Sequence, residues 1–387
     1  MQIKKGLLIG LFFVLSTPVL FGQNIGHSSI SWIDSNRNNR NITTEVYYPS
    51  NLNGNNVPVA NGRFSFIVFG HGFSMVWSAY QNIWSALVPE GYIVVIPTTE
   101  GSLSPSHSNF GLDLEFLIKK IKLTGVGNII PPSQIGPNSA LMGHSMGGGA
   151  AFLASANSTG ATTLVTFAAA NTNPSSITAA QQVTLPTLVI SGSNDCVAPP
   201  NQHQDPMYQS TISPLKTQLY IQGGGHCYFA DYNFNCAFGE ATCTPAPTIS
   251  RSQQQSATTD FVKLWLSYFL NNNCSDAQRF QDSLIQSQRI SFRQSRSIAC
   301  PNSIQISADE TTDLQLLPNP NSGKFTIENL KNVELITVFN SLGIQMFSIS
   351  KPEKSCSIQL PNPIPGIYFL HFQLNNGQFI LKKMIIH

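Results

Sequence analysis

The sequence predicts an α/β fold with a mostly parallel central sheet, followed by a small antiparallel β-sandwich. Up to about residue 273, short continuous apolar runs alternate with longer amphipathic segments. This alternation is typical of parallel strands that helices cover on both faces. From Leu314 onward, short segments alternate apolar with polar residues, which is typical of antiparallel strands. A length of 387 residues is enough for two or three such units.

The expected elements of the first unit follow from this pattern. Helices are expected at Trp77–Pro89 and Gly111–Leu123, and Thr259–Leu270 has apolar residues at helical spacing that make it the expected last element of the core. Residues 271–312 are rich in Gln, Ser and Arg and are interpreted as a tail and a linker, with the domain over 24–301 and the linker over 302–313. The expected buried strands are Phe64–Phe69, Tyr92–Pro97, Ser139–Met142, Thr163–Ala169, Pro186–Ser191 and Thr217–Ile221.

Residues 1–22 are predicted to be a secretory signal peptide. Lys4 and Lys5 form a short positive region, the stretch from Gly6 to Phe21 is mostly apolar, and Gly22 offers a small residue for cleavage. The alternative is a membrane helix, but the apolar stretch is too short to span a bilayer comfortably. Export also permits disulfides.

Composition argues against several functions. Charged residues make up 10% of the sequence, the formal net charge is +2, and no long cluster of Lys and Arg occurs. The sequence therefore lacks the basic patch of a nucleic-acid-binding protein. It has no H-E-x-x-H or C-x-x-C metal motif, and no G-x-G-x-x-G segment opens a helix after a strand. We expect a monomer with no nucleic acid, no metal and no cofactor.

The strongest catalytic signal is the segment GHSMG at residues 143–147, which fits G-x-S-x-G. It follows a predicted strand and precedes a run of small residues, which predicts a tight strand-to-helix turn. On such a turn the Ser hydroxyl stands clear of the sheet and close to the N–H groups of the helix. The segment predicts an α/β-hydrolase fold with Ser145 as the nucleophile. The alternative is a Gly- and Ser-rich turn without a catalytic role.

A serine nucleophile needs a base and an acid, and on this fold their order along the chain is Ser, acid, His. Asp195 and His226 each follow the end of a predicted strand, where α/β sheets build their sites. We predict that His226 is the base and that Asp195 orients it. His71 and His144 are interpreted as residues that line the site or satisfy backbone groups. The rival candidates are Asp205 and Asp231 for the acid and His203 for the base.

The developing negative charge on the substrate oxygen needs hydrogen-bond donors. On this fold they are the backbone N–H after the nucleophile and an N–H from the loop after an early strand. Here these donors are predicted to be Met146 and Phe73. The ring of Phe73 is then expected to face a substrate, the alternative being an ordinary core aromatic.

The sequence has seven cysteines, and six of them precede residue 301. Three disulfides and one free thiol form the simplest arrangement, although other pairings are open. Because two cysteines directly follow the predicted acid and base, a disulfide between them would join the two loops. The expected disulfides are Cys196–Cys227, Cys236–Cys243 and Cys274–Cys300.

Several segments carry a family resemblance: GHSMGGG at 143–149, NDCVAP at 194–199, GGH at 224–226, WLSYF at 265–269, Cys274 and Cys300-Pro301. Through them residues 24–301 resemble the bacterial cutinases and poly(ethylene terephthalate) hydrolases. The resemblance implies ester hydrolysis in an open cleft, with substrate contacts from Phe73, His144 and Met146. The sequence departs from the family at Ala168–Asn171, because it lacks the Trp that flanks an aromatic substrate there.

The C-terminal segment 314–387 opens with the turn sequence PNPNSG at 318–323. It resembles the C-terminal sorting domain of the type IX secretion system through that turn, NSLG at 340–343, GIYF at 366–369 and Lys382-Lys383. The resemblance implies export by that machinery and removal of the domain. The alternative is a carbohydrate-binding module. The expected strands are Lys324–Glu328, Glu334–Asn340, Gly343–Phe347, Cys356–Leu360, Gly366–Leu374 and Phe379–Ile386.

Taken together, these features predict a secreted serine esterase of the cutinase type that acts on an ester or polyester, including poly(ethylene terephthalate). One alternative is a lipase or a small-ester, dienelactone-type esterase without polymer activity. Another is a non-catalytic surface binding protein that retains the hydrolase shell.

Overall fold

The computed structural model describes residues 24–157, 159–300, 314–341, 344–375 and 379–387. The chain forms two compact units that divide between Ala299 and Cys300. The predicted signal peptide and the predicted linker lie outside the described residues. Among the residues that are described, no helix combines the length and the apolar character needed to cross a bilayer.

A ten-stranded sheet forms the centre of the first unit, in the order β10-β9-β8-β7-β6-β4-β5-β2-β1-β3. Six central strands run parallel, as the sequence predicts. They are β4 (Phe64–Gly70), β5 (Tyr92–Pro97), β6 (Ile135–His144), β7 (Thr163–Phe167), β8 (Thr187–Gly192) and β9 (Lys216–Ile221). Antiparallel pairing extends the sheet at both edges. The edge strands are β1 (Asn24–Asp34), β2 (Arg40–Ser50) and, at the other edge, β10 (Ile290–Gln294), with the short β3 (Gly54–Asn55) parallel to β1.

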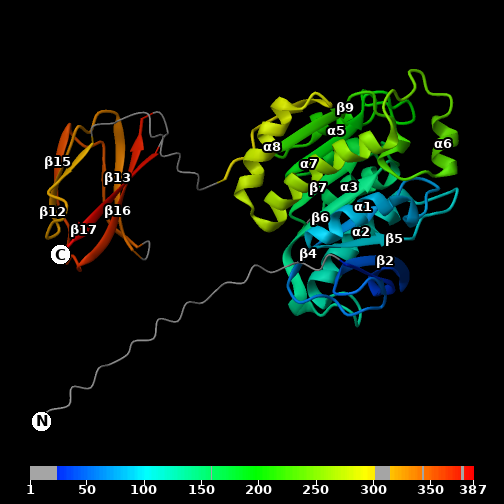
Figure 1. Cartoon of the computed structure of the whole chain (residues 1–387), viewed down its shortest axis with the longest axis horizontal. Helices are drawn as coiled ribbons and strands as arrows, with labels where there is room; N and C mark the ends of the chain where they lie inside the picture. Colours follow the sequence, from blue (N-terminus) through cyan, green and yellow to red (C-terminus); the bar gives the residue numbers. More distant parts are fainter. Residues whose placement is uncertain (1–23, 158, 301–313, 342–343, 376–378) are drawn as a thin grey trace, which may run out of the picture. The chain divides into compact units, whose positions relative to one another are not determined.

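Helices cover both faces of this sheet (Figure 1). Successive side chains of a strand point to opposite faces, so Ile67 and Phe69 of β4 contribute to one core and Phe66 and Val68 to the other. The first core includes α1 (Gln81–Leu87), α7 (Arg251–Asn271) and α8 (Cys274–Gln286). The second core includes α2 (His107–Thr124), α3 (Met146–Ser155), α4 (Ser176–Ala180) and α5 (Gln204–Ser210).

The expectation of a tail after residue 270 is wrong. Residues 274–286 form α8, and residues 290–294 form β10, which pairs with β9. Ala277, Phe280 and Leu284 are buried against α7 at helical spacing. The polar residues between them lie on the outer face. These three apolar side chains are enough to attach α8, because they pack on a core that α7 and the sheet already form.

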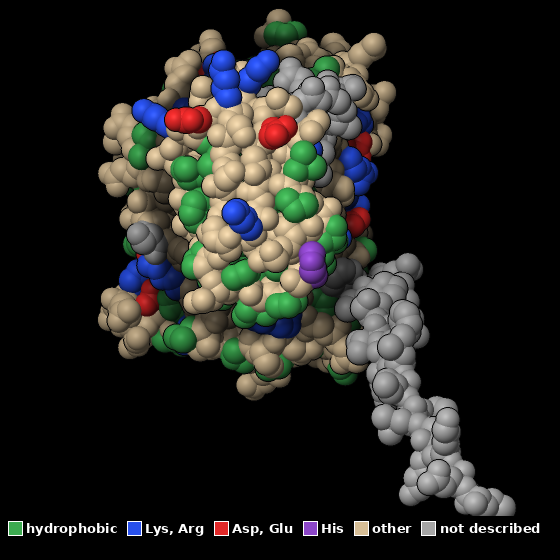
Figure 2. Space-filling view, turned by 90° about the vertical axis from the view of Figure 1, so that its left-hand side faces the viewer, with side chains coloured by type: hydrophobic (Ala, Val, Ile, Leu, Met, Phe, Trp, Pro, Cys, Tyr) green, Lys and Arg blue, Asp and Glu red, His purple; other side chains and the backbone are tan. Residues whose placement is uncertain are grey.

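The second unit is a β-sandwich, as predicted. One sheet has the order β11-β12-β15 and the other the order β14-β13-β16-β17. Their inner faces share a core that includes Phe325, Ile336 and Leu370. The strands are β11 (Gln315–Leu317), β12 (Lys324–Glu328), β13 (Val333–Asn340), β14 (Gln345–Ser350), β15 (Ser355–Gln359), β16 (Gly366–Leu374) and β17 (Phe379–Ile386). On the face drawn in Figure 2, Lys and Arg side chains lie among Asp, Glu and neutral side chains.

A buried charge cluster joins β2 to α2 in the first unit. Asp113 of α2 is fully buried, and its carboxylate accepts hydrogen bonds from Arg40 Nε at 2.8 Å and Arg40 Nη2 at 2.7 Å. Arg37 Nη2 lies 2.7 Å from the same carboxylate, and Thr99 Oγ1 donates to it at 2.7 Å. The hydrogen bond with Asp113 raises the pKa of Arg40. The cluster therefore holds the end of β5 against the hairpin of β1 and β2.

We expect Asp113→Ala to lower the free energy of unfolding of the first unit by roughly 3 kcal/mol, because it removes the buried carboxylate that Arg37 and Arg40 share and leaves them only Asp34 and Glu100 as carboxylate partners. Urea denaturation of the oxidised protein measures this loss. Lys263→Ala, which breaks the exposed pair with Glu90, serves as the control and should cost less than about 1 kcal/mol. A similar loss in both variants would contradict the role given to Asp113.

Candidate active site

Ser145 occupies the sharp turn between the end of β6 and the start of α3. Its backbone has φ 55° and ψ −121°, a combination that non-glycine residues rarely adopt. Hydrogen bonds hold this strained conformation from two sides. The Ser145 N–H donates to the carbonyl of Phe167 at 2.9 Å, and the Ser145 carbonyl accepts from Ala170 and Gly149 at 2.9 and 3.1 Å. The predicted turn is therefore present, and backbone contacts enforce it.

The glycines of the motif allow three backbones to approach one another. A Cβ atom on Gly147 would lie 2.1 Å from the carbonyl oxygen of Gly70, at the end of β4. A Cβ on Gly143 would lie 2.4 Å from the carbonyl oxygen of Gly147. Neither position accepts a side chain without displacement of the main chain. The first turn of α3 therefore lies directly against the ends of β4 and β6.

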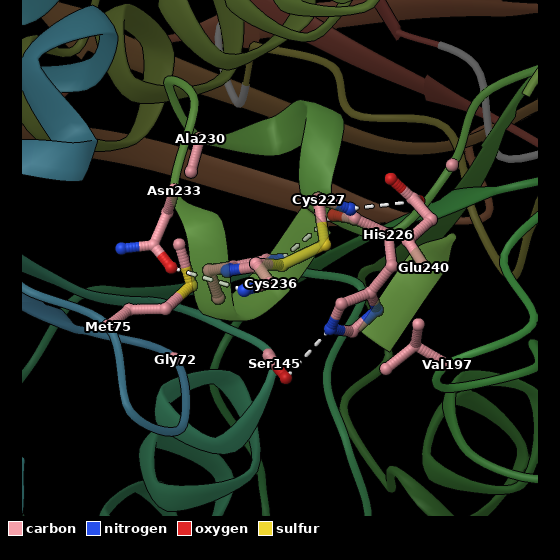
Figure 3. The surroundings of a disulfide bond; sticks show 12 residues. Gly72, Met75, Ser145, Val197, His226, Cys227, Ala230, Asn233, Cys236 and Glu240 are labelled. Carbon is pink, nitrogen blue, oxygen red and sulfur yellow. Dashed lines mark hydrogen bonds between the residues drawn. A yellow bond between two sulfur atoms is a disulfide. The ribbon is translucent and has the colours of Figure 1, made fainter. Parts of the chain in front are cut away.

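Ser145, His226 and Asp195 meet at the carboxyl end of the sheet. His226 Nε2 lies 2.8 Å from Ser145 Oγ, as Figure 3 shows, and His226 Nδ1 lies 2.7 Å from Asp195 Oδ2. All three side chains are buried or nearly so. Because a carboxylate only accepts, His226 Nδ1 carries the proton, and Nε2 is free to accept one from the Ser145 hydroxyl.

Two backbone groups fix the carboxylate of Asp195. The N–H groups of Val197 and Ala198 donate to Asp195 Oδ1 at 2.9 and 2.8 Å. Each oxygen of the carboxylate is therefore engaged, one by the backbone and the other by His226. This arrangement orients the imidazole and stabilises the positive charge that it would acquire during proton transfer.

The rival candidates have other partners. Asp205 contacts Arg293, Gln218 and Tyr220, and Asp231 accepts hydrogen bonds from Asn82 and Gln255. His203 Nδ1 accepts from the backbone of Asn171 at 2.9 Å. None of the three rivals is hydrogen-bonded to Ser145 or His226.

The two other histidines near the site satisfy neighbouring groups. His144 is fully buried, with Nδ1 3.0 Å from the Tyr80 hydroxyl and Nε2 3.1 Å from the carbonyl of His226. Burial holds the pKa of His144 well below its usual value, with a smaller contribution from His226, so this ring stays neutral. Both ring nitrogens of His71 face backbone carbonyls, those of Gly72 and Thr99.

The His144 ring has no exposed surface in this structure, so its burial does not favour the implied substrate contact, which stays a prediction. The side chain of Met146 is also withdrawn, since it is only 3% exposed and packs in the core with α2. Phe73 differs from both because its ring is 48% exposed. Of the three predicted substrate contacts, only the Phe73 side chain is accessible.

Two backbone donors remain available beside Ser145. In the described part of the chain, the N–H groups of Phe73 and Met146 have no hydrogen-bonded partner. The loop that carries Phe73 is held by Tyr80, whose buried hydroxyl accepts from the Gly72 N–H at 2.7 Å. The same hydroxyl contacts His144 and the sulfur of Met75. Tyr80 thus joins this loop to the motif around Ser145.

The disulfides near the site differ from the expected pairs. Cys196 is bonded to Cys243, and Cys227 is bonded to Cys236. Cys196 and Cys227 directly follow Asp195 and His226, but their sulfur atoms reach the segment around α6 (Phe234–Glu240) instead of each other. Figure 3 shows the Cys227–Cys236 bond close to His226. The acid and base loops are each joined to this segment rather than to each other.

The remaining cysteines agree with the predicted arrangement of three bridges and one thiol. Cys274 and Cys300 are both disulfide-bonded, and Cys356 is free. In the chain-entropy model, a bridge across 47 residues contributes about 4 kcal/mol, and a bridge across 9 residues contributes about 2.5 kcal/mol. The described residues contain no group of three or more His, Cys, Asp or Glu side chains that could hold a metal ion.

Sequence reasoning did not find Tyr80 or the role of α6. Tyr80 lies in an amphipathic segment where an aromatic residue is expected to be core, and nothing local distinguishes it. Its contacts with Gly72 and His144 come from residues 8 and 64 positions away. For α6, the cysteines at positions 236 and 243 indicated that disulfides hold this segment. They did not indicate that the partners are Cys227 and Cys196.

Comparisons with known proteins match both units of the chain to families. A family model described as PET hydrolase-like matches residues 25–243, and a model described as a secretion system C-terminal sorting domain matches residues 315–387. The chain is 23% identical over 197 residues to cutinase est1 of Thermobifida alba. The matched region is 50% of this chain and 60% of that protein. It is 26% identical over 193 residues to a bis(hydroxyethyl) terephthalate hydrolase of Streptomyces coelicolor. This match is 49% of this chain and 56% of that protein. The chain thus spans little more than half the length of these curated relatives.

We expect Tyr80→Phe to slow the labelling of Ser145 by a fluorophosphonate about tenfold, because Gly72 loses its partner and the loop with the Phe73 donor is no longer held. Mass spectrometry of the labelled peptide over time measures this rate. Tyr92→Phe is the matched control, since it removes another buried hydroxyl, one that accepts from Asn271. Labelling of Tyr80→Phe at the parent rate would refute this role.

Proposed function

We propose that this chain, which belongs to the PET hydrolase-like family, is a secreted carboxylic ester hydrolase that uses Ser145, His226 and Asp195 as its catalytic triad. The observation that carries the proposal is the continuous hydrogen-bonded series from Ser145 Oγ through His226 to Asp195, with lengths of 2.8 and 2.7 Å. A serine hydroxyl is a weak nucleophile until a base accepts its proton, and His226 is oriented to do so.

The proposed reaction has two halves. Ser145 Oγ attacks the ester carbonyl carbon while its proton passes to His226 Nε2. The N–H groups of Phe73 and Met146 stabilise the resulting oxyanion. His226 then gives the proton to the departing alcohol, and an acyl-enzyme remains. Water attacks the acyl-enzyme in the same manner, with His226 again as base, and releases the acid and free Ser145.

The curated relatives indicate the class of bond, because their names describe a cutinase and a hydrolase of bis(hydroxyethyl) terephthalate. We extend this to polyester substrates, including poly(ethylene terephthalate). Phe73, in the loop after β4, and Val197, two residues after Asp195, have exposed apolar side chains, at 48% and 42% exposure. They offer an apolar wall for the substrate.

One observation favours a second candidate, a lipase or small-ester esterase without polymer activity. The segment Ala168–Asn171 has no aromatic ring. Ala168 and Ala169 are buried, and the Asn171 side chain accepts hydrogen bonds from Ser175, Ser176 and Ile177. This side of the site therefore offers little surface on which an aromatic substrate ring could stack.

The C-terminal sorting domain indicates where the reaction takes place. This domain directs the chain through a secretion system to the cell surface or the extracellular space. We propose that the β-sandwich is the part recognised by the type IX secretion machinery. A soluble or solid ester outside the cell is then accessible to the first unit.

We expect Ser145→Ala to lower the turnover of p-nitrophenyl butyrate by at least about a thousandfold, because the nucleophile is removed. Ser155→Ala is the matched control on the same helix, since the Ser155 hydroxyl is buried and has no hydrogen-bonded partner among the described residues. Initial rates and circular dichroism measure activity and folding. Substantial turnover by folded Ser145→Ala would remove the proposed mechanism.

A chain-length series separates the two candidate functions. For a polyesterase, we expect turnover of p-nitrophenyl esters and the release of soluble products from an amorphous polyester film, because an open apolar site accepts a polymer segment. Chromatography of the products measures the film reaction, with Ser145→Ala as the blank. Rapid turnover of short esters without any release from the film would establish the second candidate.

A further inference from the structure

The surface of α6 is the strongest unexplained feature of the first unit. Phe234 and Phe238 lie four residues apart, are 69% and 75% exposed, and stack with ring centroids 6.3 Å apart. We call these two rings the aromatic face of α6. Water disfavours exposed aromatic surface, and adjacent exposed rings are typical of an interaction site. The core of the unit does not require them, because neither ring belongs to it.

Covalent bonds prevent α6 from burying this face. Cys236 within the helix is bonded to Cys227, and Cys243 just after it is bonded to Cys196. Glu240 on the opposite side of the helix is buried and accepts a hydrogen bond from the Cys227 N–H at 3.1 Å. The helix is thus held by its inner side, with the two rings outward.

The helix that carries the aromatic face contacts two loops of the proposed active site. Asn235, next to Phe234, donates through Nδ2 to the carbonyl and hydroxyl oxygens of Ser74, both at 3.0 Å. Ser74 follows Phe73, whose ring is exposed and whose backbone N–H is a proposed oxyanion donor. Cys227, at the far end of the disulfide, follows His226. The helix therefore adjoins both the oxyanion loop and the base loop.

The chemistry of this surface selects the kind of partner. Glu240 is the single charged residue between positions 232 and 244, and it is buried. An outward surface with rings and no charge favours an uncharged, apolar partner over an ionic one. The partner must also be long enough to contact α6 and Ser145 at the same time. A solid polyester fits both conditions, because its chains are neutral and rich in apolar groups.

We propose that the aromatic face of α6 is an adsorption surface for solid polyester that extends the substrate-binding region beyond the proposed triad. This inference rests on the proposed function. It assigns Phe234 and Phe238 to the binding of the polymer surface, with Ser145 supplying the chemistry. The two disulfides keep the adsorption surface at a fixed position relative to the triad.

The test compares two variants of the full oxidised chain. The first is the double variant Phe234→Ser/Phe238→Ser. The second is Ile285→Ser, a matched control on α8, where the side chain is 78% exposed. Figure 1 shows α8 and α6 at opposite edges of the first unit. Adsorption to poly(ethylene terephthalate) nanoparticles is measured by depletion with all proteins in the Ser145→Ala background, so that the surface stays intact. Turnover of p-nitrophenyl acetate and of film is measured with the active proteins.

We expect the double variant to lose about tenfold in adsorption constant and in film turnover, because two apolar contacts are removed. Its turnover of p-nitrophenyl acetate should change by less than about twofold, since a small soluble ester does not reach α6. Ile285→Ser should behave as the parent in every assay. If the double variant does not fold, Phe238→Ser alone should still lose about threefold in adsorption.

Adsorption of the variants at the parent level would overturn the inference, as would an equal loss with Ile285→Ser. Equal losses on the soluble ester and the film would also overturn it, because the face would then act on the triad rather than on the polymer. Failure of the proposed function looks different. In that case the parent protein would not hydrolyse soluble esters, whatever its adsorption.

Discussion

The close contact between the first turn of α3 and the end of β4 is the constraint on which the site depends. Gly147 can lie against Gly70 only because neither residue has a side chain. This contact places Ser145 at the tip of the turn with a positive φ, and it brings the loop after β4 next to the start of α3. Main-chain packing therefore positions Ser145 and the proposed Met146 donor, and the side chain of Tyr80 holds the loop that carries the proposed Phe73 donor.

Burial divides the residues around the proposed triad into two groups. His144 and Tyr80 are fully buried and hold the loops through hydrogen bonds. Phe73 and Val197 are exposed and are free to contact a ligand. A motif cannot make this distinction, because His144 lies beside the nucleophile in the sequence and yet has no accessible surface. Proximity along the chain and access to the substrate are separate properties.

The α6 segment connects two loops of the proposed site covalently. The acid loop and the base loop are each bonded to it, and Asn235 adds the loop that carries Phe73. The expected Cys196–Cys227 bond would have joined only two loops. The observed pairing leaves α6 outside the core, where it has surface to offer. The same bonds that order the triad thus keep two aromatic rings in water.

The sequence by itself predicted the parallel sheet, the sandwich, and the three side chains that the structure brings together, Ser145, Asp195 and His226, because apolar periodicity and the chain order of these residues are local or nearly local signals. It did not determine α8, whose three apolar residues become a helix face only against α7. Tertiary structure alone decided the disulfide pairs and the burial of His144, because both depend on the direction of side chains in space. Adjacency to the triad residues placed the cysteines in the correct loops, but only the path of the chain through α6 determined which sulfur atoms meet.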